Sequence, residues 1–431
     1  MKKRAIIIVI DSMGIGAMPD CEEFGDTKEC NTLRNVCAFN NGLDVPVLEA
    51  MGLGNIQDFK GIKKTATPIA QYGTLQEKSK GKDTTTGHWE IAGLVSEKPF
   101  STFPNGFPKE LVDKFIQETG CKGILANIPA SGTAIIEKLN DEHHSTGYPI
   151  VYTSADSVFQ IAVDTDMIAL ETLYEWCKIA RRLLDEGNYN TARVIARPYK
   201  VIDGKPTRIS KDRRDYSMEP PEDTVLDKVK KARAKVIGIG KIEDIFSKAG
   251  ITHAIHTGSN KEGLELTIKA LDGSLDLEKI KYEGVNITDA DREIIFTNLV
   301  DTDMLFGHRN NAKGYGEAIE EIDDYLEKIL PLIGENDLLI ITADHGNADE
   351  MYEMDKKTGL PKKDKEGHYK AKTSHTLNPV PCIIYDNFGS DSYTVKQSDN
   401  YGLSNVAATV VNLMGYEAPD FWDSSMIEIN K

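Results

Sequence analysis

Carboxylate and imidazole side chains recur in four short segments that lie far apart in the sequence. These segments are residues 11–16, 81–90, 301–308 and 342–347, and His375 follows further along the chain. Their side chains offer oxygen and nitrogen ligands and no thiolate, a donor set that suits Mn²⁺, Zn²⁺ or Mg²⁺. Two such ions about 4 Å apart hold both the attacking and the leaving oxygen of a phosphoryl transfer. The residue types therefore favour a two-metal phosphotransferase.

The six candidate metal ligands fall into two sets. Asp303, His308 and His375 form one set, and Asp11, Asp344 and His345 form the other. Each set leaves coordination positions open for substrate oxygens, as a catalytic metal requires. One Asp after a strand is often only a helix cap, so the prediction rests on the combination of residues.

Three consecutive threonines, Thr84 to Thr86, offer a nucleophile. A threonine hydroxyl is weakly nucleophilic at neutral pH, so it needs a metal ion or a base to activate it. The alternative is that the three residues form a polar turn or a helix cap before Gly87. The residue types alone leave the choice among the three hydroxyls open.

Buried strands are predicted to position these side chains. Apolar, β-branched runs are typical of strands that are covered on both faces, as in a parallel sheet. They occur at residues 5–10, 236–239, 294–296, 338–341 and 382–385. Apolar residues at helical spacing predict a helix over 315–330, and the order strand, helix, strand predicts a doubly wound α/β sheet.

Polar residues lie shortly after several of these runs. They are Asp11, Lys241, Asp303 and Asp344. Ligands of open α/β sheets collect at the carboxyl ends of the strands, so we expect these side chains to meet at one edge.

The middle of the chain differs in composition. Residues 99–220 are rich in Pro, Gly and polar residues and carry predicted helices over 109–119 and 170–185. We predict an inserted cap domain here, within a core made of residues 1–98 and 221–431. A second insertion, residues 351–372, is predicted to be a mobile surface loop.

The overall charge limits the partners. The net charge of −17, from 68 acidic and 51 basic residues, argues against binding to nucleic acid or an anionic membrane. Six cysteines without a CxxC pair indicate reduced thiols in the cytoplasm. No apolar stretch is long enough to cross a bilayer, and the run at residues 5–10 is too short for a secretion signal.

Several segments closely resemble the phosphopentomutase family. They are residues 9–16, 81–90, 152–158, 193–198, 240–242 and 298–309. The KDTxTGHWE pattern at residues 82–90 is specific to this family, whereas the metal ligands alone indicate only the wider alkaline-phosphatase superfamily. The resemblance covers nearly the whole chain and implies an alkaline-phosphatase-type core with an inserted, smaller α/β cap. The implied reaction interconverts ribose 1-phosphate, or its 2-deoxy analogue, and the 5-phosphate.

The resemblance also implies a role for individual residues. Thr84 matches the threonine that is phosphorylated, and it joins Asp11, Asp344 and His345 at the second metal. The implied substrate contacts are Ser154, Asp156, Val158, Arg193 and Ile195, with Arg208 and Lys241 as further phosphate ligands. Members of the family use Mn²⁺ (with Mg²⁺, Zn²⁺ or Co²⁺ as alternatives) and are primed by glucose 1,6-bisphosphate. The resemblance implies that the partner is a small sugar phosphate and that the protein acts in nucleotide salvage in the cytoplasm.

One stretch departs from the family pattern. Leu377 and Asn378 stand after His375-Thr376, where phosphopentomutases usually have Arg-Glu. This ending and residues 343–349 resemble cofactor-independent phosphoglycerate mutase. The alternative function is therefore a mutase or phosphatase of the same superfamily that acts on another phosphate, such as phosphoglycerate, although those mutases use a serine nucleophile. A non-catalytic metal-binding relative is a third class. Such a relative would be expected to lack a metal ligand or the nucleophile, and this sequence has all of them.

Overall fold

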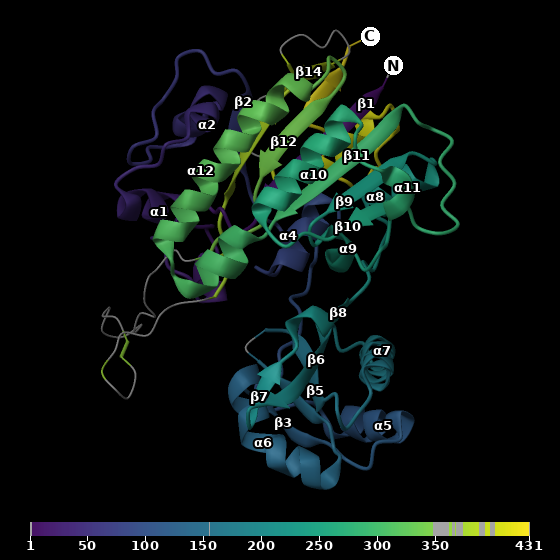
Figure 1. Cartoon of the computed structure of the whole chain (residues 1–431). Helices are drawn as coiled ribbons and strands as arrows, with labels where there is room; N and C mark the ends of the chain where they lie inside the picture. Colours follow the sequence, from purple (N-terminus) through teal and green to yellow (C-terminus); the bar gives the residue numbers. More distant parts are fainter. Residues whose placement is uncertain are drawn as a thin grey trace. The chain divides into compact units, whose positions relative to one another are not determined.

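The computed structural model describes residues 2–154, 156–347, 362–363, 367, 374–387, 393–396 and 401–430. The predicted mobile loop at 351–372 lies outside the described residues, apart from Lys362, Lys363 and Gly367. The chain divides into two compact units (Figure 1), one made of Met1–Glu97 and Pro220–Lys431 and the other of Lys98–Glu219. The sequence places these divisions after residues 98 and 220.

The larger unit is built on a mixed sheet. Within the described residues it has seven strands in the order β10-β9-β11-β1-β12-β13-β2. The strands are β1 (Lys3–Ile10), β2 (Gln71–Leu75), β9 (Lys235–Ile239), β10 (His253–Ile255), β11 (Arg292–Leu299), β12 (Leu338–Thr342) and β13 (Val380–Tyr385). The first five in spatial order run parallel, whereas β13 is antiparallel to β12 and β2 is antiparallel to β13.

The strands lie where the apolar runs predict them. Residues 5–10, 236–239, 294–296, 338–341 and 382–385 fall in β1, β9, β11, β12 and β13. The predictions of these strands are confirmed, but the antiparallel direction of β13 differs from the parallel arrangement expected. A run that is buried on both faces has the same apolar pattern in a parallel and in an antiparallel strand. The sequence therefore does not show the direction of the strand.

Helices cover the sheet of this unit. They are α1 (Thr32–Asn40), α2 (Pro46–Met51), α3 (Leu53–Ile56), α4 (Thr84–Ile91), α8 (Val225–Lys231), α9 (Ile242–Ile245), α10 (Asn260–Asp272), α11 (Leu277–Ile280), α12 (Ala312–Ile329) and α13 (Asn405–Leu413). In Figure 1, α10 and α12 lie across one face of the sheet, and α12 also packs against α1 and α2. Helix α13 contacts β1 and packs against α4 and α8. Since β1 is buried from Arg4 to Ile10, helices protect both of its faces.

Shorter elements complete the larger unit. They are η1 (Cys21–Phe24), η3 (Thr302–Phe306), η4 (Gly307–Arg309), η5 (Leu330–Leu332), β14 (Tyr393–Val395) and β15 (Ile427–Ile429). The predicted helix at 315–330 corresponds to α12, and its apolar residues Ile319, Ile322, Leu326 and Ile329 are all buried. This prediction is confirmed.

The smaller unit has a sheet and a core of its own. Its strands are β3 (Leu125–Pro129), β4 (Ile150–Thr153), β5 (Val158–Asp164), β6 (Arg193–Ile202), β7 (Lys205–Arg208) and β8 (Arg214–Ser217), and its helices are α5 (Lys109–Thr119), α6 (Gly132–Thr146), α7 (Leu170–Glu186) and the short η2 (Ser210–Asp212). The sheet order is β3-β4-β5-β6-β7, and β8 also pairs with β6. Helices α5 and α7 pack on one apolar cluster and α6 on another. The two helices predicted at 109–119 and 170–185 are confirmed by α5 and α7.

Among the described residues, no helix combines the length and apolar character needed to cross a bilayer.

Candidate active site

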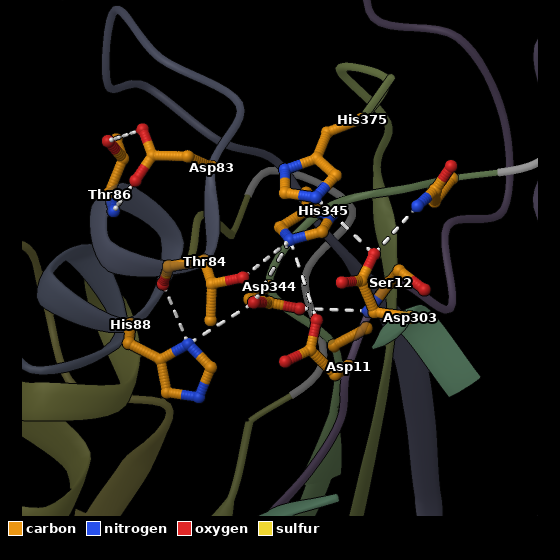
Figure 2. Close-up of polar contacts among 12 residues, drawn as sticks. Asp11, Ser12, Asp83, Thr84, Thr86, His88, Asp303, Asp344, His345 and His375 are labelled. Carbon is orange, nitrogen blue, oxygen red and sulfur yellow. Dashed lines mark hydrogen bonds and ion pairs between the residues drawn. The ribbon is translucent and has the colours of Figure 1, made fainter. Parts of the chain in front are cut away.

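The three central strands bring distant acidic residues together. Strand β1 lies between β11 and β12, with Ile10 opposite Leu299 and Val9 opposite Thr342. Because these strands are parallel, their carboxyl ends lie at the same edge of the sheet. Asp11 follows β1, Asp303 follows β11 within η3, and Asp344 follows β12. Figure 2 shows the three carboxylates converging with two histidines.

One group of ligands gathers around His345. Its Nε2 lies 3.5 Å from Oδ1 of Asp11 and 3.3 Å from Oδ2 of Asp344. The Oγ1 atom of Thr84, at the start of α4, lies 3.2 Å from the same nitrogen. The structure thus brings Asp11, Asp344, His345 and Thr84 together, and all of them except Thr84 are buried.

The second group of ligands adjoins the first. Nε2 of His308 lies 3.2 Å from Oδ2 of Asp303, and Nε2 of His375 lies 3.4 Å from Oδ1 of the same carboxylate. The two Nε2 atoms are 3.3 Å apart. The ring of His375 stacks on that of His345, with centroids 4.0 Å apart. Ligand atoms of Asp303, His345 and His375 also lie within 4.8 Å of one another, so His345 borders both groups.

The charges of this cluster fit a divalent cation. Burial, together with the nearby carboxylates of Asp344 and Asp303, raises the pKa of Asp11 to about 7. Burial opposes ionisation of Asp303 as well, yet His375 and His308 hold the pKa of its carboxyl well below its usual range. Among the described residues, Oδ1 of Asp11 and Oδ2 of Asp344 accept no hydrogen bond although both are buried. Cations between these oxygens would relieve the repulsion and supply the missing partners.

Backbone and amide groups orient the acidic ligands. Asn298 Nδ2 donates to Oδ2 of Asp11 over 3.0 Å, and Asn347 Nδ2 donates to Oδ1 of Asp303 over 2.7 Å. Such outer partners fix the direction of a ligand and are part of a metal site. We did not predict either asparagine, because a single amide near a strand end has no distinguishing pattern in the sequence.

The turn after β1 is also shaped for the site. Ser12 has a φ of 69°, in the left-handed region that residues other than glycine seldom adopt. In this conformation its N–H donates to Oδ1 of Asp344 over 3.0 Å. Strain of this kind persists where the surrounding structure enforces it.

Hydrogen bonds also fix two of the histidine ligands. His375 donates from Nδ1 to the carbonyl of Lys82 over 2.9 Å, and His345 donates from Nδ1 to that of Gly346 over 3.1 Å. In each ring, Nε2 is therefore the nitrogen that faces the carboxylates.

The three threonines have different environments. Asp83 caps α4 and accepts from the N–H of Thr86 over 3.1 Å and from its hydroxyl over 2.6 Å. Thr86 therefore forms part of the helix cap, which was the alternative role considered for the three threonines. Thr84 instead faces His345. Gly87 permits this approach, because a Cβ there would lie 2.4 Å from the carbonyl oxygen of Asp344.

The departure from the family pattern leaves the histidine segment anchored. The N–H of Leu377 donates to Oδ2 of Asp26 over 2.9 Å, and Nζ of Lys82 donates to Oδ1 of the same carboxylate over 2.8 Å. Asn378 is buried and donates from Nδ2 to the carbonyl of Gly16. The backbone beyond His375 is thus linked through Asp26 to Lys82, without the usual Arg-Glu pair.

The substrate-contact residues expected in the smaller unit lie near one end of its sheet. Val158 pairs with Arg193 across β5 and β6, and Ile195 lies two residues further along the same face. Ser154 and Asp156 occupy the loop between β4 and β5, where Oγ of Ser154 accepts from the N–H of Asp156 over 3.3 Å.

Two further cations fall elsewhere. Arg208 is an exposed residue of β7, opposite Tyr199 of β6. Lys241 belongs to the larger unit, directly before α9, and its charge counteracts the burial that raises the pKa of Asp301. Asp215, on β8, was not predicted, yet its Oδ2 lies 3.6 Å from Nη1 of Arg193.

Comparisons with known proteins agree with this geometry. A model of the Metalloenzyme superfamily matches residues 3–418. A phosphopentomutase of Caldanaerobacter subterraneus subsp. tengcongensis is 46% identical over 417 residues, which are 96% of this chain and 94% of that protein. A phosphopentomutase of Carboxydothermus hydrogenoformans is 45% identical over 433 residues, covering 100% of each chain.

A solved structure supports the fold. A phosphoglycerate mutase of Leishmania mexicana covers 100% of this chain and 98% of its own, with 15% sequence identity and a TM-score of 0.50. The predicted fold class is confirmed. The chain belongs to the Metalloenzyme superfamily and, within it, to the phosphopentomutase family.

Proposed function

We propose that this protein is a phosphopentomutase, which interconverts ribose 1-phosphate, or 2-deoxyribose 1-phosphate, and the corresponding 5-phosphate. The observation that carries the proposal is the position of Thr84, whose Oγ1 lies 3.2 Å from Nε2 of His345 beside two groups of metal ligands. Two relatives with this name align with 94% and 100% of their own length. The serine nucleophile of the alternative, phosphoglycerate-directed enzymes has no counterpart in this position.

The proposed metal ions are two Mn²⁺. Asp303, His308 and His375 would hold one, and Asp11, Asp344, His345 and Thr84 would hold the other. When bound, such ions neutralise charge on the phosphoryl group and lower the pKa of a bound hydroxyl. Mn²⁺ favours nitrogen and oxygen donors, and this site has no sulfur ligand.

The chemistry proceeds through a phosphorylated Thr84. The sugar hydroxyl attacks the phosphorus, the bond between phosphorus and Oγ1 of Thr84 breaks, and a sugar bisphosphate forms. The proton lost by the sugar hydroxyl passes to Oγ1 of Thr84 as the bond between Oγ1 and phosphorus breaks. The second phosphoryl group is then transferred to Oγ1, so the sugar leaves with its phosphate on the other carbon. A trace of glucose 1,6-bisphosphate supplies the first phosphoryl group.

The smaller unit is proposed to recognise the sugar phosphate. The proposed substrate contacts of this unit are Ser154, Asp156, Val158, Arg193, Ile195 and Arg208. Lys241, in the larger unit, is a further proposed phosphate ligand. Arginine binds phosphate oxygens in a bidentate manner. Asp215 lies 3.6 Å from Arg193 and forms a bidentate ion pair with Arg213. The proposed setting is nucleotide salvage in the cytoplasm.

A substrate comparison tests the proposal. Purified protein with Mn²⁺ and a trace of glucose 1,6-bisphosphate is given either ribose 1-phosphate or 2-phosphoglycerate, and the products are identified by ³¹P NMR. We expect ribose 5-phosphate from the first and no reaction of the second. Isomerisation of 2-phosphoglycerate alone would overturn the proposal in favour of a phosphoglycerate mutase.

A further inference from the structure

His88 is a fully buried histidine that the proposed mechanism does not use. It lies on α4, one turn after Thr84, and its ring stacks on Phe296 of β11 with centroids 5.7 Å apart. Figure 2 shows the imidazole between α4 and the carboxylate of Asp344.

The Nδ1 atom of His88 faces two oxygens of the active site. It lies 2.8 Å from the carbonyl oxygen of Thr84 and 3.2 Å from Oδ2 of Asp344. Both oxygens are acceptors, so the ring hydrogen is on Nδ1, where it donates to Thr84 and lies beside the carboxylate. Ser12 donates to the other oxygen of Asp344 over 3.0 Å, so this carboxylate accepts one hydrogen bond and contacts the imidazole with its second oxygen.

The other ring nitrogen gives no structural benefit. Nε2 of His88 is buried and has no hydrogen-bond partner among the residues that the structure describes. A buried polar atom without a partner lowers stability, and an apolar ring would pack on Phe296 without that penalty. The imidazole is therefore best explained by what Nδ1 contacts.

The contact also depends on how closely α4 approaches β12. A Cβ on Gly87 would lie 2.8 Å from Cβ of Asp344, so only a residue without a side chain allows this distance. The neighbouring His88 can then reach across to the carboxylate. A single imidazole thus contacts the peptide group of the nucleophile and a ligand from the second metal group.

We propose that His88 is a positioning residue that fixes the distance between Thr84 and Asp344. This inference rests on the proposed function, because it assigns Thr84 as the nucleophile and Asp344 as a metal ligand. Without the Nδ1–H group, the first turn of α4 loses its connection to the carboxylate, and Oγ1 of Thr84 no longer stays beside His345. Misplacement of a reacting group by about 1 Å costs on the order of 100-fold in rate.

Three substitutions separate this role from a structural one. His88→Asn places an amide N–H close to the position of Nδ1, His88→Gln places it one carbon further out, and His88→Phe removes it. The matched control is His253→Gln, which removes another buried imidazole of the same unit, on β10 and outside the ligand groups. Each variant is measured for thermal unfolding, for Mn²⁺ binding by titration calorimetry, and for phosphothreonine by intact mass spectrometry after incubation with glucose 1,6-bisphosphate.

We expect His88→Gln and His88→Phe to weaken binding of one Mn²⁺ by about 10- to 100-fold. Their phosphothreonine should form about 100-fold more slowly, whereas His88→Asn should recover at least about tenfold of that rate. His253→Gln should change neither property. The inference is overturned if His88→Asn is as impaired as His88→Phe, or if His88→Phe binds Mn²⁺ and becomes phosphorylated like the unchanged protein.

The Mn²⁺ titration also distinguishes this inference from the proposed function. If the unchanged protein fails to isomerise ribose 1-phosphate, the proposed function fails. Weaker Mn²⁺ binding by His88→Phe but not by His88→Asn would still support the contact between His88 and Asp344. If the unchanged protein isomerises the sugar phosphate and all the His88 variants bind Mn²⁺ equally well, only the inference about His88 fails.

Discussion

Thr84 and His345 meet at a distance of 3.2 Å, from Oγ1 to Nε2, although they are 261 residues apart in the sequence. Thr84 begins a helix and His345 follows a strand, so secondary structure on both sides fixes the contact. Groups held on helices and strands are placed more accurately than groups on loops. This contact is what distinguishes Thr84 from its two neighbours.

Replacing Thr84 tests the assignment of the nucleophile. Thr84→Ala should lower mutase turnover by on the order of 10³-fold or more and abolish labelling by ³²P-glucose 1,6-bisphosphate, because the attacking oxygen is gone. The fold should survive, as judged by circular dichroism. Thr85→Val is the control and should still be labelled. Label retained by Thr84→Ala would move the nucleophile to Thr85 or Thr86.

Removal of metal should destabilise the larger unit. Buried carboxylates that repel one another gain from a bound cation, so Mn²⁺ stabilises the folded state over the unfolded one. At a hundredfold excess over Kd, the free energy of unfolding should rise by about 2.7 kcal/mol. The measurement is urea denaturation with Mn²⁺ and with EDTA. Asp344→Asn should show a smaller response, and an equal response would contradict the ligand assignment.

Gly87 should not tolerate a side chain. A Cβ at this position would lie 2.4 Å from the carbonyl oxygen of Asp344, so Gly87→Ala must push α4 away from β12. We expect a loss of about 1–3 kcal/mol in the free energy of unfolding. Turnover should fall by on the order of 100-fold, since Thr84 is displaced with the helix. Gly73→Ala is the control, because a Cβ there meets no atom within 4 Å.

His253 should make the protein less stable in mild acid. Burial, with the charges of Lys235 and Lys281, lowers the pKa of this histidine to about 4. The unfolded chain, with a pKa near 6.5, therefore binds a proton that the folded chain does not, and stability falls as the pH drops from about 6.5 to 4.

Between pH 7 and pH 5 this difference amounts to roughly 2 kcal/mol in the free energy of unfolding. Urea denaturation at both pH values, compared with His253→Gln, isolates the effect from other groups that titrate. The substitution should reduce the loss of stability by about that amount. Identical pH dependence in both proteins would show that His253 does not contribute.

The strands and the types of candidate ligand can be predicted from the sequence, whereas the direction of every strand cannot. Apolar β-branched runs such as residues 5–10 identify buried strands. A carboxylate just after such a run, such as Asp11, lies where ligands of open α/β sheets collect. The direction of β13 has no comparable signal. This strand pairs antiparallel with β12.

The contacts that orient the ligands were the hardest to predict. Asn298 lies within β11, and only the register of that strand against β1 brings its amide to Asp11. His88 belongs to a conspicuous motif, yet its distance to Asp344 depends on the absence of a side chain at Gly87. The left-handed backbone of Ser12 likewise follows from tertiary contacts, because serine has no local preference for that conformation.

The position of β1 in the sheet also affects how the chain is made. This strand is translated well before its lateral neighbours β11 and β12. The growing chain therefore carries an apolar strand with both edges open, while Lys98–Glu219 already contains every strand of its own sheet. Open strand edges recruit other chains, so the edges of β1 are prone to aggregation until β11 and β12 have been synthesised.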